Sequence, residues 1–159
     1  MRRLGVKVEK DYEELLGLLD RNKVRYCVVG AYAVAYYSRP RYTKDLDILV
    51  DPTEENSKKL IKALSDFGFG SLKLSDADFT KKGNVIQLGY EPVRVDILTS
   101  IKGISFSRVW KSKRAGRYGR HKVFFIGREE LVENKKLTGR KQDKADVDML
   151  VSARPKGKG

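Results

Sequence analysis

Two aspartates, Asp45 and Asp47, stand one residue apart at the head of an apolar run that ends at Val50. The alternation predicts a β-strand in which both carboxylates project from one face and the aliphatic residues turn toward a core. Two like charges so close repel each other and would raise each other's pKa, unless a cation or a basic partner neutralises them. Hard oxygen ligands of this kind suit Mg²⁺ or Mn²⁺, as in many sites of phosphoryl transfer. Seen alone, the pair favours a turn or a solvated strand end, so the metal hypothesis depends on its surroundings.

The residues before and after this pair extend the pattern. Residues 26–29 predict an apolar strand that ends at Gly30-Ala31 and continues as a helix. A glycine at such a turn lets the backbone approach a phosphate, and the amides at the start of the helix attract anions. Residues 93–98 predict a second alternating strand, which carries Asp96. A third carboxylate on a neighbouring strand would serve a two-metal site, because it can ligate one ion and accept the proton of an attacking hydroxyl.

The order of these pieces resembles the nucleotidyltransferase superfamily that includes DNA polymerase beta. Its signature is an apolar residue followed by Gly-[Gly/Ser], then Asp-x-Asp, then a distant third aspartate on a strand. Residues 28–48 look more narrowly like the small stand-alone bacterial and archaeal members, including relatives of AbiEii-type toxins. Their Leu-Ile-x-x-Lys…Gly-Arg-x-x-Asp-x-x-Asp ending resembles residues 130–147, with matching positions at Lys135, Gly139, Arg140, Asp143 and Asp146. The resemblance covers the chain from about residue 24 to residue 150.

The resemblance implies a fold and an activity. The expected fold is α/β (α+β), the nucleotidyltransferase fold, in which a mixed, twisted β-sheet has helices mainly on one face and a C-terminal helical extension. The expected activity is metal-dependent transfer of a nucleoside monophosphate from an NTP, such as ATP, to a hydroxyl acceptor. By the same resemblance, Asp45 and Asp47 would hold two Mg²⁺ or Mn²⁺ ions. Asp96 would ligate one ion and help to deprotonate the acceptor.

A nucleotide-binding set also follows from the resemblance. Gly30 and the amide of Ala31 would meet the triphosphate, and Lys135 would clamp its charge. Thr43 and Arg41 would brace the approach to the carboxylates, although Arg41 could equally contact a phosphate. Ala31 departs from the Gly or Ser of the family, because it offers no hydroxyl and places a methyl group where glycine would allow close approach. That departure motivates an alternative, a catalytically weakened protein that binds nucleic acid or a partner on the same fold.

The strongly basic composition favours a polyanionic partner. The 159 residues include 34 Lys and Arg against 21 Asp and Glu, a formal net charge of +13. Nucleic acid is the partner that such an excess favours, although the surface of a charged thermophilic protein would fit equally. The basic segment 105–120 interleaves its cations with Phe106, Trp110 and Tyr118. Exposed rings there could stack on unpaired bases, whereas buried rings would be part of the core.

The identity of the acceptor stays open at this point. The basic charge and the toxin-like ending favour RNA, for example the 3′ end of a tRNA, while a protein side chain or a small molecule would serve the same chemistry. A toxin–antitoxin context would add a small helical partner protein that completes the substrate-binding surface.

The C-terminal part predicts two helices, over residues 129–137 and 142–153, broken at Thr138-Gly139. Asp143 and Asp146 fall on the apolar face of the second helix, and Lys135 turns inward on the first. A carboxylate on an apolar face normally has a partner, so an ion-pair network of these residues, joined by Arg140, is the structural alternative to a triphosphate clamp.

The chain as a whole predicts one compact unit. We expect a nucleotidyltransferase core over residues 1–127, a helical extension over 128–153 packed on that core, and a flexible basic tail over 154–159. Amphipathic helices are expected over 11–20 and 53–67, and a hairpin over 84–98.

The remaining chemistry-bearing residues exclude several classes of site. The single cysteine, Cys27, lies in an apolar strand, so no internal disulfide forms and a reducing cytoplasm is expected. The single histidine, His121, has no second His or Cys with which to make a zinc site. No apolar stretch approaches the length of a membrane span, so no membrane association is expected.

Overall fold

A single six-stranded mixed sheet forms the centre of the fold. The structure, a computed structural model, describes residues 9–39, 45–90 and 93–152. The strands are β1 (Tyr26–Val29), β2 (Asp45–Val50), β3 (Val85–Tyr90), β4 (Val93–Leu98), β5 (Arg114–Tyr118) and β6 (His121–Phe125). They lie in the order β3-β4-β2-β1-β6-β5. β2 runs parallel to β4 and β1 parallel to β6, while the other neighbours are antiparallel. The predicted mixed sheet is therefore confirmed.

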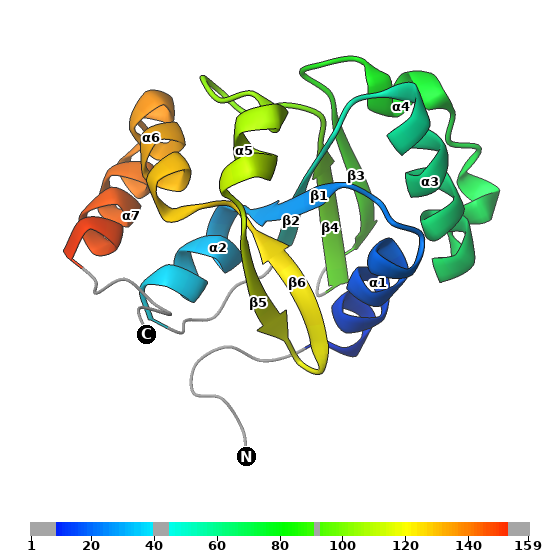
Figure 1. Ribbon diagram of the computed structural model, residues 1–159, viewed down its shortest axis with the longest axis horizontal. Coiled ribbons are helices and arrows are strands. Elements are labelled where there is room, and N and C mark those ends of the chain that lie inside the picture. The colour runs from blue at the N-terminus through cyan, green and yellow to red at the C-terminus, as the bar shows by residue number, and fades with distance from the viewer. Residues whose placement is uncertain (1–8, 40–44, 91–92, 153–159) are drawn as a thin grey trace.

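Helices flank the sheet at both ends of the molecule (Figure 1). They are α1 (Lys10–Arg21), α2 (Gly30–Tyr37), α3 (Glu54–Leu64), α4 (Asp76–Thr80), α5 (Phe106–Ser112), α6 (Arg128–Thr138) and α7 (Lys141–Ser152). α1 packs against α3 and β6, whereas α6 and α7 lie side by side and contact α2. Within the described ranges, no helix combines the length and the apolar character needed to cross a membrane.

The predicted elements agree closely with those observed. The strands over 26–29, 45–50 and 93–98 have the predicted bounds, and β3 and β4 form the predicted hairpin. The helix predicted over 53–67 begins where the hydroxyl of Thr53 accepts a hydrogen bond from the amide of Asn56. It ends as an α-helix at Leu64, and residues 65–69 continue as a π-helical turn (Ser65–Phe69) kinked at Gly68, followed by a short 3₁₀ turn (Gly70–Leu72).

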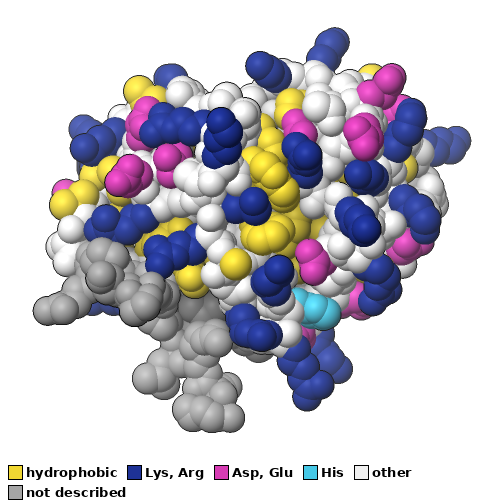
Figure 2. Space-filling model, viewed as in Figure 1, with side chains coloured by type: hydrophobic (Ala, Val, Ile, Leu, Met, Phe, Trp, Pro, Cys, Tyr) yellow, Lys and Arg dark blue, Asp and Glu magenta, His cyan; other side chains and the backbone are white. Residues whose placement is uncertain are grey.

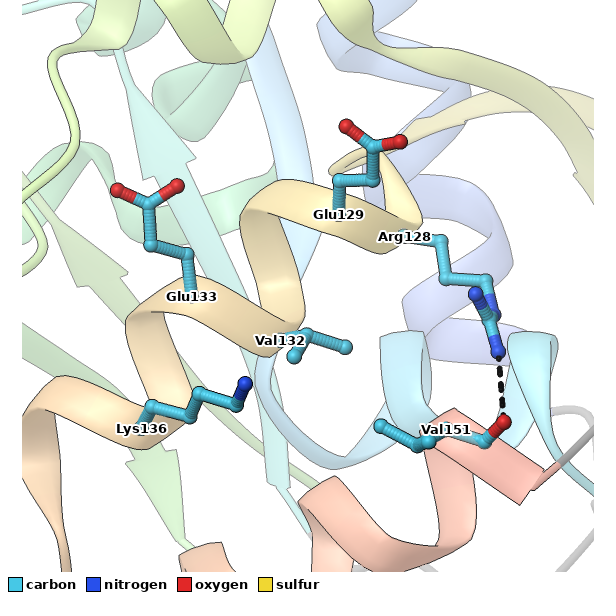
Figure 3. Close-up of a pocket in the computed structure, with 6 residues that line it drawn as sticks. All are labelled: Arg128, Glu129, Val132, Glu133, Lys136 and Val151. Carbon is cyan, nitrogen blue, oxygen red and sulfur yellow. Dashed lines mark hydrogen bonds between the residues drawn. The ribbon is translucent and has the colours of Figure 1, made fainter.

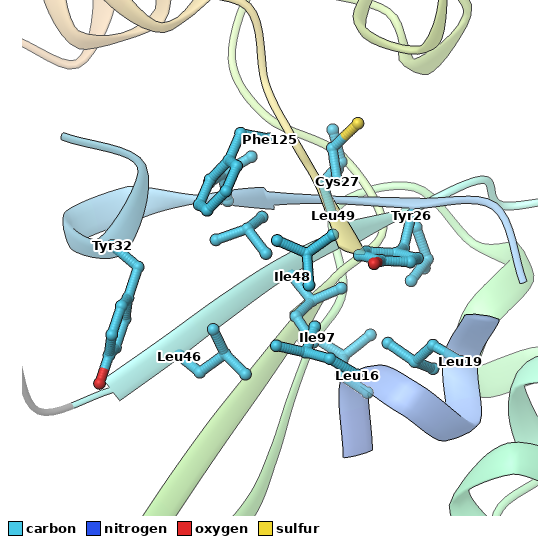
Figure 4. Packing of buried hydrophobic residues seen from close by; sticks show 14 of the residues in the cluster. Leu16, Leu19, Tyr26, Cys27, Tyr32, Leu46, Ile48, Leu49, Ile97 and Phe125 are labelled. Carbon is cyan, nitrogen blue, oxygen red and sulfur yellow. The ribbon is translucent and has the colours of Figure 1, made fainter. Parts of the chain in front are cut away.

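The apolar core lies between the sheet and the helices, and it holds the strands that carry the aspartates. Leu16 and Leu19 of α1 pack toward Tyr26 of β1, and toward Ile48 and Ile97 of the central strands (Figure 4). All five side chains are buried. Burial of each such side chain contributes about 1.5–3 kcal/mol, so β2 and β4 are anchored on one face while their polar residues project from the other.

Some of the predictions concern residues that the structure does not describe. Arg41, Thr43 and the tail 154–159 lie outside the described residues. The division into a core over 1–127 and an extension over 128–153 stays a prediction. The break between the two C-terminal helices is confirmed, because Gly139 ends α6 in the left-handed conformation, with φ of 67°.

Candidate active site

Parallel pairing of β2 with β4 assembles a square of four charged residues. Asp45 lies opposite Arg94, and Asp47 lies opposite Asp96. Residues two apart on a strand share a face, so all four side chains project from the same side of the sheet. The three predicted carboxylates are therefore neighbours, as the sequence pattern required.

Arg94 is the fourth member of this square and was given no role in the sequence interpretation. Its Nε donates to Asp96 Oδ1 at 3.1 Å, and its Nη2 donates to Asp96 Oδ2 at 3.0 Å. Its Nη1 lies 3.8 Å from Asp45 Oδ2. The sequence does indicate that Arg94 and Asp96 share a face, because residues 93–98 alternate apolar with charged side chains over Arg94 and Asp96. The guanidinium neutralises part of the repulsion that three adjacent carboxylates create.

Asp47 lies in a buried environment beside two other carboxylates. Burial, with the nearby charges of Asp96 and Asp45, raises its pKa from 3.8 to about 7, although Lys135 and Arg94 oppose the shift. Asp45 shows a second sign of incomplete neutralisation. Its Oδ1 is buried and has no hydrogen-bond partner among the described residues. Both observations show negative charge that the described residues do not fully neutralise.

The residues present fit a divalent metal by their chemistry. They offer carboxylate oxygens, one of them buried and unpaired, which are the donors that Mg²⁺ and Mn²⁺ prefer. Within residues 9–39, 45–90 and 93–152, however, no three His, Cys, Asp or Glu side chains are already grouped as a metal site. One of the three candidate ligands is already engaged, because the guanidinium of Arg94 donates to both carboxylate oxygens of Asp96.

Gly30 brings the turn after β1 against Asp47. Its φ of 69° lies in the left-handed region, which glycine adopts without strain. A Cβ atom at this position would collide with the carboxylate of Asp47. Gly30, the glycine of the predicted phosphate-binding turn, is therefore also needed to leave room for the side chain of Asp47, a candidate metal ligand. Ala31 follows it at the start of α2 and is partly exposed.

A cleft of about 470 Å³ opens beside Asp47. Its lining includes the Gly30-Ala31 turn, Lys135 of α6 and Arg140 in the link between α6 and α7. Lys102, in the loop after β4, adds a third cation. The volume lies within the roughly 300–1,000 Å³ typical of small-molecule sites. The cleft therefore brings together four of the predicted site residues, namely Gly30, Ala31, Asp47 and Lys135.

Lys135 is held by a buried network, the structural alternative that the sequence left open. Its Nζ lies 3.4 Å from Asp143 Oδ1 and 3.2 Å from Asp146 Oδ2. Both carboxylates are only 1% exposed. Arg140 donates to Asp143 through Nε at 2.8 Å and through Nη2 at 3.1 Å, and Thr138 donates its hydroxyl at 2.5 Å. The hydrogen bonds from Arg140 hold the pKa of Asp143 well below its usual range.

The chain as a whole is similar to several solved structures. The lincosamide antibiotic adenylyltransferase LnuA, with lincomycin bound, superposes with a TM-score of 0.56 at 18% identity, covering 93% of this chain and 98% of that one. A candidate nucleotidyltransferase from Thermotoga maritima gives 0.60 at 16% identity, covering 94% and 98%. An antigenic nucleotidyltransferase-like protein from Paracoccidioides brasiliensis gives 0.55 at 14%, covering 91% and 76%. This chain has the nucleotidyltransferase fold.

The fold prediction is thereby confirmed, and the activity must be argued from the site, because one fold can carry many functions. No protein-family model matches the sequence, and no curated protein matches it either. In this nucleotidyltransferase-fold protein, the narrower likeness to AbiEii-type toxins stays a prediction.

The aromatic residues of the basic segment belong mainly to the packed structure. Tyr118 is buried, and Trp110 stacks on Phe106 and meets the ring of Phe124 edge-on. The ammonium of Lys113 lies 3.8 Å from the centre of the Trp110 ring. These rings are engaged within the protein, so the packing favours the core interpretation over a base-stacking platform. Figure 2 shows Lys and Arg side chains spread over the visible face, with acidic ones among them.

The structure also places the single cysteine and the single histidine of the chain. Cys27 is buried in the core, and burial raises the pKa of its thiol to about 12, which argues against a nucleophile. His121 is partly exposed, and its ring packs close to Gly17 of α1.

A second cavity, of about 370 Å³, lies between α6 and α7. Its lining residues are Arg128, Glu129, Val132, Glu133, Lys136 and Val151 (Figure 3). Arg128 reaches across it from the start of α6 and donates to the backbone carbonyls of Leu150 and Val151 near the end of α7. We interpret this cavity as part of the contact that joins the two helices.

The raised pKa of Asp47 predicts a pH-dependent effect of Asp47→Asn. In the folded state Asp47 keeps its proton up to about pH 7, whereas unfolding returns its pKa to about 3.8, so its contribution to stability is lost as pH rises between these values. Without added metal, we expect Asp47→Asn to be more stable than the wild type by about 1–3 kcal/mol at pH 8 and nearly equal to it at pH 4. Thermal denaturation at both pH values measures this, with the exposed Asp20→Asn as control. A difference that does not change with pH would contradict the assignment.

The buried network predicts that Lys135 stabilises the fold. Lys135→Met leaves the carboxylates of Asp143 and Asp146 without their ammonium, which costs about 3–5 kcal/mol. Lys136→Met, on the exposed side of the same helix, should change the free energy of unfolding by about 0.5 kcal/mol or less. Urea denaturation of both variants measures the contrast. Equal stabilities would show that Lys135 is not needed by the network.

Proposed function

We propose that this protein transfers a nucleoside monophosphate from an NTP to a hydroxyl acceptor and releases pyrophosphate. One observation carries the proposal. Within a nucleotidyltransferase fold, Asp45 and Asp47 on β2 project beside Asp96 on β4, next to the turn at Gly30. Adjacent carboxylates at a glycine turn offer both metal ligation and a place for phosphate.

Asp45, Asp47 and Asp96 would hold Mg²⁺ or Mn²⁺. When bound, the metal supplies positive charge that stabilises the phosphates of the substrate and the charge that develops on them. The unpaired Oδ1 of Asp45 and the raised pKa of Asp47 support this assignment, because each marks negative charge that the protein alone does not neutralise.

The triphosphate would lie in the cleft beside Asp47. The backbone at Gly30-Ala31 would meet it on one side, and Lys135 and Arg140 would supply positive charge on the other. Arg140 is better placed for direct contact, because its side chain is 73% exposed while that of Lys135 is 11% exposed. Arg41 and Thr43 are proposed to brace the same approach.

The chemical step needs no covalent intermediate on the protein. The acceptor oxygen forms a bond to the α-phosphorus, the bond from that phosphorus to the pyrophosphate oxygen breaks, and the hydroxyl proton passes to a carboxylate. Asp96 is the proposed acceptor of this proton, and withdrawal of Arg94 would free both of its oxygens from the guanidinium.

Two acceptor classes are supported by different observations. The net charge of +13 favours RNA, including tRNA. The likeness to LnuA, an antibiotic adenylyltransferase with lincomycin bound, favours a small hydroxylated molecule and extends over 98% of that chain. A protein acceptor, or a helical partner in a toxin–antitoxin pair, would use the same carboxylates.

The test is transfer of label from each α-³²P-labelled NTP in the presence of Mg²⁺. Total RNA, a panel of hydroxylated small molecules and the protein itself serve as acceptors. We expect label on one acceptor class and a loss of at least 100-fold in Asp45→Asn/Asp47→Asn. Asp20→Asn, an exposed carboxylate on α1, is the matched control and should retain the wild-type rate.

The acceptor that carries the label names the substrate class. Equal labelling by the wild type and the double variant would contradict the assignment of the carboxylates. No transfer with any NTP, together with no Mg²⁺-dependent NTP binding by calorimetry, would favour the alternative of a weakened binding protein on the same fold.

A further inference from the structure

Arg94 occupies the position where the carboxylate cluster needs positive charge. Its guanidinium makes a two-pronged contact with Asp96 and reaches Asp45 on the neighbouring strand. Of the two carboxylates, Asp96 is 14% exposed and Asp45 is 29% exposed. Ion pairs at partly buried groups are screened less than surface pairs. The contact therefore holds these carboxylates strongly as long as no other cation competes for them.

The side chain of Arg94 can leave without disturbing the strand. The hydroxyl of Tyr12 holds the backbone of Arg94 by two hydrogen bonds. It donates to the carbonyl of Arg94 at 2.8 Å and accepts from the amide of Arg94 at 3.1 Å. Backbone pairing over the register from Asp45 to Leu49 holds β2 to β4 independently of the guanidinium. With its main chain anchored and its side chain 29% exposed, Arg94 has a path toward solvent.

A divalent ion and the guanidinium require the same oxygens. The square formed by Asp45, Asp47, Arg94 and Asp96 has three formal negative charges and one positive charge. A metal bound to Asp45 and Asp96 would lie within a few ångströms of the guanidinium, and the two cations would repel each other. The two cations therefore compete for these carboxylates, and the binding of one weakens the hold of the other.

We propose that Arg94 is a resident cation that holds the carboxylates together in the metal-free protein and is displaced when the metal binds. Arg94 is thus a positioning residue that acts through Asp45 and Asp96, and it sets the metal affinity of the site. This inference rests on the proposed function, because it takes the three aspartates as metal ligands. It predicts that removal of the guanidinium tightens metal binding and loosens the metal-free protein.

Mn²⁺ binding measured by calorimetry and by electron paramagnetic resonance tests this inference without any substrate. Arg94→Met keeps the aliphatic length and removes the charge. We expect it to bind Mn²⁺ at least tenfold more tightly than the wild type. Arg108→Met is the matched control, since Arg108 on α5 also makes a two-pronged contact with a carboxylate, that of Glu133 on α6. It changes the net charge equally and should leave Mn²⁺ affinity unchanged.

Thermal denaturation gives a second readout. Metal-free Arg94→Met should melt at a lower temperature than the metal-free wild type, and added Mn²⁺ should raise its melting temperature by more than it raises that of the wild type. If Arg94→Met fails to fold, Arg94→Lys decides the matter. A lysine keeps the charge but lacks the planar fork, so its Mn²⁺ affinity should exceed that of the wild type.

The outcomes separate this inference from the proposed function. Mn²⁺ binding by the wild type that is as tight as, or tighter than, binding by the Arg94 variants would overturn the resident-cation role and leave the proposed function standing. Equal tightening in Arg108→Met would overturn it as well, because net charge alone would explain the effect. Absence of Mn²⁺ binding by the wild type and by every variant would overturn both proposals.

Discussion

Parallel pairing of β2 with β4 sets like charges side by side, and the rest of the candidate site depends on this constraint. The register that places Asp47 opposite Asp96 also places Asp45 opposite Arg94. The strands can hold that arrangement because their other faces are anchored in the core by side chains such as Ile48 and Ile97. Apolar burial thus maintains an electrostatic arrangement that would not form by itself.

The residues around the three carboxylates accommodate this negative charge in different ways. Arg94 neutralises part of it from within the sheet, and Gly30 leaves the space that the carboxylate of Asp47 occupies. Across the cleft, Lys135 lowers the pKa of Asp47 by its charge while it satisfies two buried carboxylates of α7. A single lysine therefore connects the structural network of the C-terminal helices to the electrostatics of the candidate site.

The sequence predicted the strands and the faces on which their aspartates lie, because both are encoded locally. Alternation over residues 45–50 and 93–98 identified the strands and the faces on which Asp45, Asp47 and Asp96 lie. The sequence places Arg94 on the same strand face as Asp96, but its approach to Asp45 depends on strand order and register, which only the structure shows. The burial of Tyr118 and the packing of the partly exposed Trp110 could not be decided from the sequence, since a ring beside cations in sequence can face either solvent or core. The sequence suggested the pairing of Lys135 with Asp143 from helical periodicity, and only the structure shows how completely it is buried.

The most direct test of the account is anomalous diffraction from crystals grown with Mn²⁺ and a non-hydrolysable NTP analogue. The account predicts Mn²⁺ peaks bound by the carboxylates of Asp45, Asp47 and Asp96, the triphosphate against the turn at Gly30, and the guanidinium of Arg94 withdrawn from Asp96. An ordered nucleotide bound elsewhere, with no Mn²⁺ at these carboxylates and Arg94 still paired with Asp96, would contradict it.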